Sequence, residues 1–303
     1  MRPIGSISVL AIVSALALAA SASASTLAVN GGVLRFDAAK GETNNVDLRD
    51  GGGQTTVTDS GSIIHAGNGC TQVTPHQASC PLPGGFGDQN VVMTLADRND
   101  AARAFKVSFG RIAIDGGAGN DTISDSPQSG ADVDGGLGDY IIFVHPNFGG
   151  SVDVHGDWGD DSITAMSASG VVNGDVGDDE ITLTSFIDLP DRTSSAYGGF
   201  GDDRITADGV TSMSLIDGGF GDDTITTSGF AVVSVLNGGF GRDAITARPD
   251  HAEQIRGGGG SDVIDGGGGA DSIDCGFGFD RYAVYDGDTA TSCELPFTPA
   301  PPV

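Results

Sequence analysis

A nine-residue unit rich in glycine and aspartate recurs ten times between residues 116 and 283 of this 303-residue chain. Two well-preserved copies are GGFGDDRIT from Gly198 and GGFGDDTIT from Gly218. The units open at residues 116, 135, 156, 174, 198, 218, 238, 257, 266 and 275, at intervals of 19, 21, 18, 24, 20, 20, 19, 9 and 9 residues. A nearly fixed period of this length is typical of repeat proteins in which each unit stacks on the next.

Two columns of apolar residues run through the repeats. One column is the eighth residue of each unit, as in Ile205 and Ile225, and the other lies two residues before each unit, as in Ile216 and Leu236. Their neighbours are mostly polar, which indicates very short strands with one inward side chain. A coil of ~20 residues then holds two strands and two turns, and coils stacked ~4.8 Å apart pair their strands in parallel. The sequence therefore predicts an all-β fold, a parallel β-roll or β-solenoid.

The repeat resembles the nonapeptide GGxGxDxUx of the RTX (haemolysin-type) calcium-binding proteins. This resemblance covers residues 114–283 and is closest in the units that open at residues 116, 198, 218, 257 and 266. It implies a β-roll with several Ca²⁺ ions between successive turns, held by sixth-position aspartates and by loop carbonyl groups. The candidate metal residues are Gly116, Gly117, Gly119, Asp121, Asp161, Asp179, Gly199, Gly201, Asp203, Gly219, Gly221, Asp223, Gly239, Gly241, Asp243, Gly258, Gly260, Asp262, Asp271 and Asp280.

The chemistry of these turns agrees with that implication. Calcium takes ~6–8 oxygen ligands and mixes carboxylates with backbone carbonyls, which glycine-rich loops can turn toward one point. The formal net charge of −27 makes multivalent cations plausible partners, and it repels nucleic acid and anionic membranes. The alternative is a glycine–aspartate turn without metal, in which stacked carboxylates repel one another without compensation.

The chain departs from the family pattern in its spacing. The family motif recurs every nine residues and places calcium on both edges, whereas most units here are about 20 residues apart. We therefore expect calcium loops mainly along one edge, with the Gly266 loop alone on the opposite edge. Tyr140 stands at the sixth position of its unit and removes that carboxylate. Third-position residues such as Phe200 and Phe220 predict an outward apolar ridge, which either docks a sugar chain or partner or only stacks on itself.

The first 24 residues resemble a cleavable signal peptide. Arg2 precedes an apolar run that ends in small residues, and the run is short for a membrane anchor, the alternative interpretation. No later segment is long and apolar enough to cross a bilayer. We therefore expect an extracellular protein, secreted or associated with the cell surface.

Four cysteines are expected to form disulfides in an oxidising compartment. Local bridges, Cys70 with Cys80 and Cys275 with Cys293, are the simplest of three possible pairings. Zinc binding is the rival interpretation, but these pairs lack C-x-x-C spacing.

Four segments follow from these features. Residues 1–24 are the signal peptide and residues 25–113 a β-rich N-terminal cap, formed either as irregular first coils or as a small domain. Residues 114–283 are the calcium-binding roll, and residues 284–303 a C-terminal cap with a Pro-rich tail.

The sequence contains neither H-E-x-x-H nor G-x-S-x-G, so we do not expect an enzyme. The favoured function is a secreted calcium-binding structural or surface protein that folds when it binds Ca²⁺. One alternative is a calcium-dependent adhesin that binds wall or extracellular polysaccharide, or a protein partner. Another is a polysaccharide lyase built on a β-solenoid.

Overall fold

The computed structural model describes twelve segments of the chain, and every structural statement below concerns them alone. The predicted signal peptide up to residue 23 and the end of the Pro-rich tail from residue 298 lie outside them. The described segments are residues 24–51, 53–81, 90–105, 111–126, 130–146, 150–166, 169–184, 194–210, 213–229, 232–247, 251–283 and 285–297.

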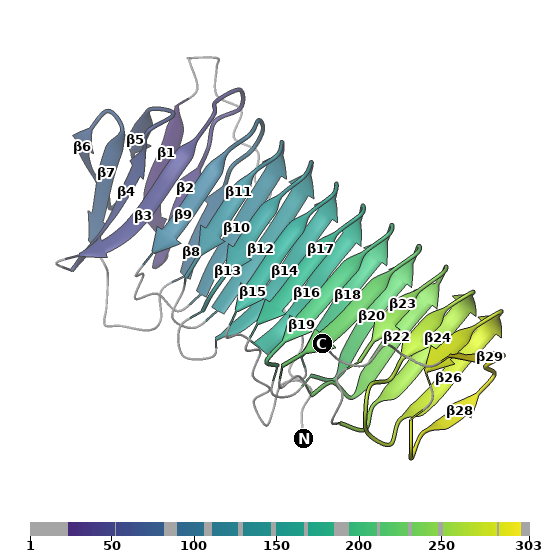
Figure 1. Ribbon diagram of the computed structural model, residues 1–303. Coiled ribbons are helices and arrows are strands. Elements are labelled where there is room, and N and C mark those ends of the chain that lie inside the picture. The colour runs from purple at the N-terminus through teal and green to yellow at the C-terminus, as the bar shows by residue number, and fades with distance from the viewer. Residues whose placement is uncertain are drawn as a thin grey trace.

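Two long sheets face each other and form an elongated solenoid (Figure 1). The first sheet has 14 strands. In spatial order they are β28 (Thr289–Thr291), β26 (Ser272–Gly278), β24 (Gln254–Gly260), β22 (Val235–Phe240), β20 (Leu215–Phe220), β18 (Ser195–Phe200), β16 (Ser169–Val176), β14 (Ser151–Trp158), β12 (Gly130–Leu137), β10 (Arg111–Ala118), β8 (Asn90–Thr94), β2 (Val33–Asp37), β1 (Ser25–Asn30) and β5 (Ile64–Ala66).

The second sheet has 15 strands and lies across the core from the first. In spatial order they are β29 (Leu295–Phe297), β27 (Arg281–Ala283), β25 (Val263–Asp265), β23 (Ala244–Thr246), β21 (Thr224–Ser228), β19 (Arg204–Asp208), β17 (Glu180–Thr184), β15 (Ser162–Met166), β13 (Ile141–Val144), β11 (Thr122–Asp125), β9 (Ala101–Phe105), β3 (Asn45–Gly51), β4 (Gln54–Asp59), β7 (Gln77–Pro81) and β6 (Thr71–Thr74).

Each coil contributes one strand to each sheet, and equivalent residues of successive coils pair in parallel. Ile205 pairs with Ile225 in the second sheet, and Ile216 pairs with Leu236 in the first. All four side chains are fully buried, so the two columns identified in the sequence form the core. The predicted β-solenoid is confirmed, and its described residues contain no helix.

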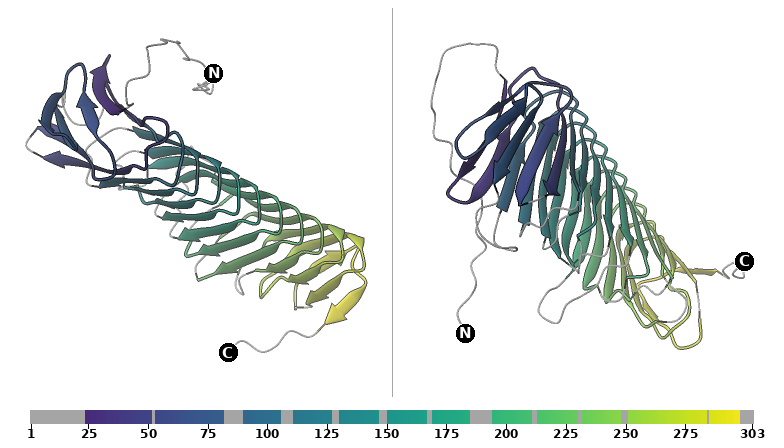
Figure 2. Two further views of the ribbon diagram at one scale, coloured as in Figure 1. Left: turned by 90° about the horizontal axis from the view of Figure 1, so that it is seen from above. Right: turned by 90° about the vertical axis from the view of Figure 1, so that its left-hand side faces the viewer.

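The N-terminal region extends the same two sheets with a different strand order. Strand β2 runs parallel to β8, and β3 runs parallel to β9, so both sheets continue from the regular coils. Farther out, β1 pairs with β2 and β4 pairs with β3 and β7 in antiparallel fashion. Figure 2 shows the regular stack giving way to these hairpins at the purple end of the chain.

Both local disulfides are present. Cys70 and Cys80 are bonded in the N-terminal region, and Cys275 and Cys293 join the last full coil to the C-terminal segment. The bridges agree with folding in an oxidising compartment. No helix in the described segments is long and apolar enough to cross a membrane.

Asp125 is an ionisable exception within the core. It pairs with Ala104 on one side and with Val144 on the other, so its side chain points inward and is only 1% exposed. Neither carboxyl oxygen has a hydrogen-bond partner. Burial raises the pKa of this carboxyl well above its ordinary value.

Candidate metal centre

The glycine–aspartate turns line up along one edge of the solenoid. Gly199 pairs with Gly219, Gly219 with Gly239 and Gly239 with Gly258, so equivalent turn residues lie one coil apart. Each of these turns leads from the first sheet to the second. The unit at Gly266 instead joins β25 of the second sheet to β26 of the first, so it lies on the opposite edge.

The second and fourth residues of each turn adopt backbone conformations that favour glycine. A Cβ at Gly219, for example, would clash with the Gly199 carbonyl of the preceding coil. The candidate glycines with positive φ are Gly117, Gly119, Gly199, Gly201, Gly219, Gly221, Gly239, Gly241, Gly258 and Gly260. These glycines therefore allow the loops of successive coils to stack in close backbone contact.

The candidate aspartates are buried rather than solvated. Their residues are at most 2% exposed, and the set comprises Asp121, Asp161, Asp179, Asp203, Asp223, Asp243, Asp262, Asp271 and Asp280.

On the main edge, the aspartate Oδ1 atoms form a ladder between coils. The backbone N–H of Asp203 donates to Oδ1 of Asp223 at 2.8 Å, and the N–H of Asp223 donates to Oδ1 of Asp243 at 2.9 Å. The same contact joins every pair of successive coils from Asp161 to Asp280. We call these residues the aspartate ladder; its members are Asp161, Asp179, Asp203, Asp223, Asp243, Asp262 and Asp280.

The second carboxyl oxygen of each ladder member has no partner. In all seven residues, Oδ2 is buried and makes no hydrogen bond, and the same holds for Asp121 and Asp271. A buried carboxylate oxygen in this state is costly unless a proton or a cation satisfies it. Because the same carboxylate oxygen lacks a partner at each equivalent position, these turns share a need for a proton or a cation.

The unpartnered oxygens face the first glycine of their own turn. A Cβ at Gly218 would clash with Oδ2 of Asp223 and would lie 2.5 Å from the carbonyl oxygen of Gly238 in the next coil. Without that Cβ, the space is bordered by one carboxylate oxygen and one carbonyl oxygen. The same arrangement recurs at Gly156, Gly174, Gly198, Gly238 and Gly257.

Burial raises the pKa of six ladder carboxyls. Desolvation is the main cause, backbone N–H donors oppose it, and neighbouring aspartates add to it. The pKa rises to about 8 for Asp161 and Asp203, to about 7 for Asp223 and Asp243, and to about 6 for Asp179 and Asp262. Near neutral pH, these groups thus lie close to the balance between holding a proton and being charged.

Tyr140 replaces an aspartate in the series of carboxylates along this edge. Its side chain is 1% exposed, and its ring lies so close to Gly116 that a Cβ there would be 2.5 Å from Tyr140 Cε1. The phenol lies beside Asp121, and burial followed by that charge raises the pKa of Tyr140. A tyrosine ring therefore fills the space that later turns leave beside a carboxylate oxygen.

Two further acids join the edge. The weak unit LADRNDAAR from Leu95 places Asp100 at its sixth position, and the Asp100 N–H donates to Oδ1 of Asp121 at 2.7 Å. At the other end, Glu294 Oε2 accepts the Asp280 N–H at 2.9 Å. Asp100 was detectable from the repeat, whereas Glu294 follows the last unit and has no periodic signal.

The residues present fit a hard cation that prefers oxygen. The donor set consists of an unpartnered carboxylate oxygen and carbonyl oxygens of stacked loops, which is the ligand chemistry of calcium. Within the described segments, no group of three or more His, Cys, Asp or Glu side chains converges as a metal site. A cation at this edge would therefore depend on backbone carbonyls for most of its ligands.

Fifth-position aspartates form a second, solvent-exposed ladder. Asp202 Oδ1 accepts the N–H of Asp222 at 2.7 Å, and Asp222 Oδ1 accepts the N–H of Arg242 at 2.8 Å. From donor to acceptor, these contacts run toward the N-terminus, whereas those of the buried ladder run toward the C-terminus. The remaining oxygen of Asp222, Oδ2, accepts from Nε and Nη2 of Arg242 at 3.1 and 2.6 Å.

The third-position ridge is exposed and stacked. The rings of Phe200 and Phe220 are 4.9 Å apart between centroids, and those of Phe220 and Phe240 are 5.0 Å apart, both nearly parallel. Their faces cover one another, so the rings present mainly edges to solvent. These three residues therefore stack on one another, as the second of the two interpretations of the ridge predicts.

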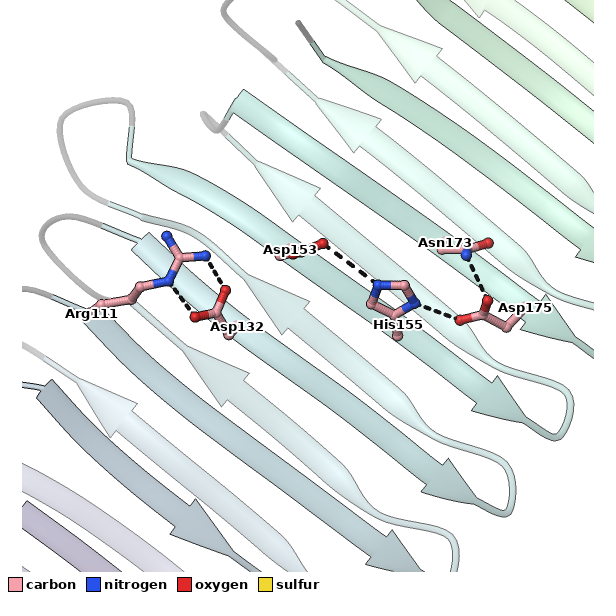
Figure 3. Close-up of polar contacts among 6 residues, drawn as sticks. All are labelled: Arg111, Asp132, Asp153, His155, Asn173 and Asp175. Carbon is pink, nitrogen blue, oxygen red and sulfur yellow. Dashed lines mark hydrogen bonds and ion pairs between the residues drawn. The ribbon is translucent and has the colours of Figure 1, made fainter. Parts of the chain in front are cut away.

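A polar cluster lies on the outer face of the first sheet. Figure 3 shows Arg111 paired with Asp132, and His155 held between Asp153 and Asp175. The His155 Nδ1 lies 2.8 Å from Asp175 Oδ2, and this contact is the main reason that the pKa of His155 rises to about 9. The imidazole is therefore protonated at neutral pH and cannot accept a proton as a general base.

Comparison of the chain with protein-family models, curated proteins and solved structures finds no match in any of the three.

Proposed function

We propose that this chain is an exported structural protein whose glycine–aspartate edge binds several calcium ions. The observation that carries the proposal is the series of buried Oδ2 atoms without partners along the aspartate ladder. The resemblance of the repeats to the RTX nonapeptide supports the same ion. The net charge of −27 also favours a partner that neutralises carboxylates.

A proton and a cation are the two ways to satisfy these oxygens. Protonation becomes less favourable as the pH rises above the ladder pKa values of about 6 to 8. A divalent cation instead stabilises the charged form and attracts carbonyl oxygens from both adjacent turns. Bound calcium would therefore account for a buried acidic ladder near neutral pH.

The turns offer oxygen atoms that could serve as ligands for such an ion. In the turn that opens at Gly218, the Asp223 carboxylate would bind the ion together with the Gly238 carbonyl of the next coil. Binding would tie adjacent coils together and offset the repulsion between Asp223 and Asp243. The ion's contribution is structural, because it supplies positive charge between the coils.

Ion binding at this edge couples folding to the calcium concentration. Each site that binds only the folded chain adds RT ln(1 + [L]/Kd), or about 2.7 kcal/mol at a hundredfold excess over Kd. Extracellular calcium modules have Kd values on the order of 10⁻⁴–10⁻³ M. A chain exported unfolded at low calcium would then fold outside the cell.

A calcium titration of the mature protein tests the proposal. Circular dichroism is followed from excess chelator to millimolar calcium and back, and bound ions are counted by elemental analysis after gel filtration. We expect a reversible gain of β structure, several bound Ca²⁺ ions, and a weaker response to Mg²⁺. An identical spectrum and melting temperature with and without chelator would refute it.

A further inference from the structure

A polar groove lies on the outer face of the second sheet, in the N-terminal region and outside the coils that carry the aspartate ladder. It has a volume of about 370 Å³ and is formed where β3, β4, β7 and β9 meet. Its neutral lining residues are Asn45, Thr56, Thr58, Ser60 and Gln77, and its charged ones are Asp47, Arg49 and Arg103. The groove therefore offers hydroxyl, amide and guanidinium groups, without an apolar side chain.

Strand alternation places these groups together. Val46 and Leu48 are fully buried, so the residues between and beside them on β3 point outward. Asp47 pairs with Thr58 on one side and with Arg103 on the other. The groove is thus built on neighbouring positions of the adjacent strands β9, β3, β4 and β7.

The two arginines differ in their partners. Arg49 donates to Asp47 through Nε at 2.9 Å and through Nη2 at 2.5 Å. Arg103 lies across from the same aspartate in the strand register, but within the described segments it makes no ion pair. Its Nη1 donates instead to the Asn45 side-chain oxygen at 3.0 Å. Asn45 therefore orients a guanidinium that makes no ion pair with a carboxylate within the described segments.

We propose that this groove binds an acidic sugar, with a uronate carboxylate on Arg103 and sugar hydroxyls on the neutral lining residues. Guanidinium groups match carboxylates in charge and in bidentate geometry. The hydroxyl and amide side chains suit a ligand with several hydroxyl groups. The volume also lies within the range of small-ligand pockets.

Binding to a carboxylated trisaccharide tests this site in the full mature chain. Isothermal titration calorimetry compares tri-galacturonate with its neutral galactose counterpart and with a sulfated trisaccharide, at fixed calcium and again in chelator. We expect the uronate to bind best. Loss of a charge-assisted hydrogen bond in Arg103→Gln should weaken binding about 10–100-fold. Arg103→Lys should retain part of the affinity.

The matched control is Arg204→Gln, because Arg204 is exposed on the same sheet outside the groove. This variant should bind like the wild type. The proposal is overturned if no uronate binds, if the neutral or sulfated sugar binds as tightly, or if Arg103→Gln has no effect. Uronate binding that depends on calcium and not on Arg103 would place it at the aspartate ladder. Calcium binding itself is scored separately by ion count.

Discussion

Replacing Asp223 with asparagine should have opposite effects on stability in chelator and in calcium. The substitution keeps a side-chain oxygen for the Asp203 N–H, which donates to Oδ1 at 2.8 Å. It also turns the unpartnered Oδ2 into an uncharged amide group. The variant therefore removes a buried charge with little change in shape.

The size of the effect follows from the pKa of Asp223. Burial raises that pKa from 3.8 to about 7, and the residue is only 1% exposed. Since each pKa unit corresponds to about 1.4 kcal/mol, the charged form costs the metal-free fold about 4 kcal/mol at pH 8. Asp223→Asn should raise the free energy of unfolding in chelator by this amount.

The pH dependence has a definite sign. Between pH 4 and pH 8 the folded metal-free chain holds more protons than the unfolded chain, because its ladder pKa values are raised. The stability of the wild type in chelator should therefore fall as the pH rises through this window. Near pH 4 the carboxyl is protonated in the fold, so the advantage of Asp223→Asn should be smallest there.

Calcium should reverse the order of stability. The wild type gains binding energy from ions that the amide no longer holds, so the variant becomes the less stable protein. Urea unfolding followed by circular dichroism measures both conditions. Asp202→Asn serves as the control, because Asp202 lies at the surface and accepts the Asp222 N–H. A variant less stable than the wild type in chelator, or still more stable in calcium, would contradict this reasoning.

Three further substitutions have defined outcomes. Gly218→Ala places a Cβ against the Asp223 carboxylate, so it should lower both the number of bound calcium ions and the melting temperature. The control is Gly259→Ala, which should change neither, because its Cβ would be 3.4 Å from a Phe240 ring atom. Tyr140→Asp restores the missing carboxylate and should add one bound calcium ion, as counted by elemental analysis. The control Tyr140→Phe should add none. If Tyr140→Asp leaves the number of bound ions unchanged, the tyrosine ring does not exclude an ion. Asp125→Val replaces a buried, unpartnered carboxyl in the core, so it should raise the free energy of unfolding by about 1–3 kcal/mol. Urea titration measures this change, and a loss of stability would show that Asp125 has a structural role.

The period of the repeat by itself determines the fold. A coil of about 20 residues with two inward aliphatics, such as Ile205 and Ile216, buries them only by stacking on its neighbours. Because every repeat carries the same pattern of apolar and turn residues, the parallel pairing of the strands and the shared edge of the turns could be predicted. The position of Gly266 on the opposite edge followed from the same spacing.

The tertiary structure decided what surrounds each carboxyl group. The contact of Asp203 with Asp223, and the position of Tyr140 against Gly116, depend on how coils 18 to 24 residues apart come into register. The groove around Arg103 depends on a still longer separation, since its partner Asn45 is 58 residues away. Sequence periodicity specifies which residues recur, but only the packed coils determine which charges are buried and which remain open to a ligand.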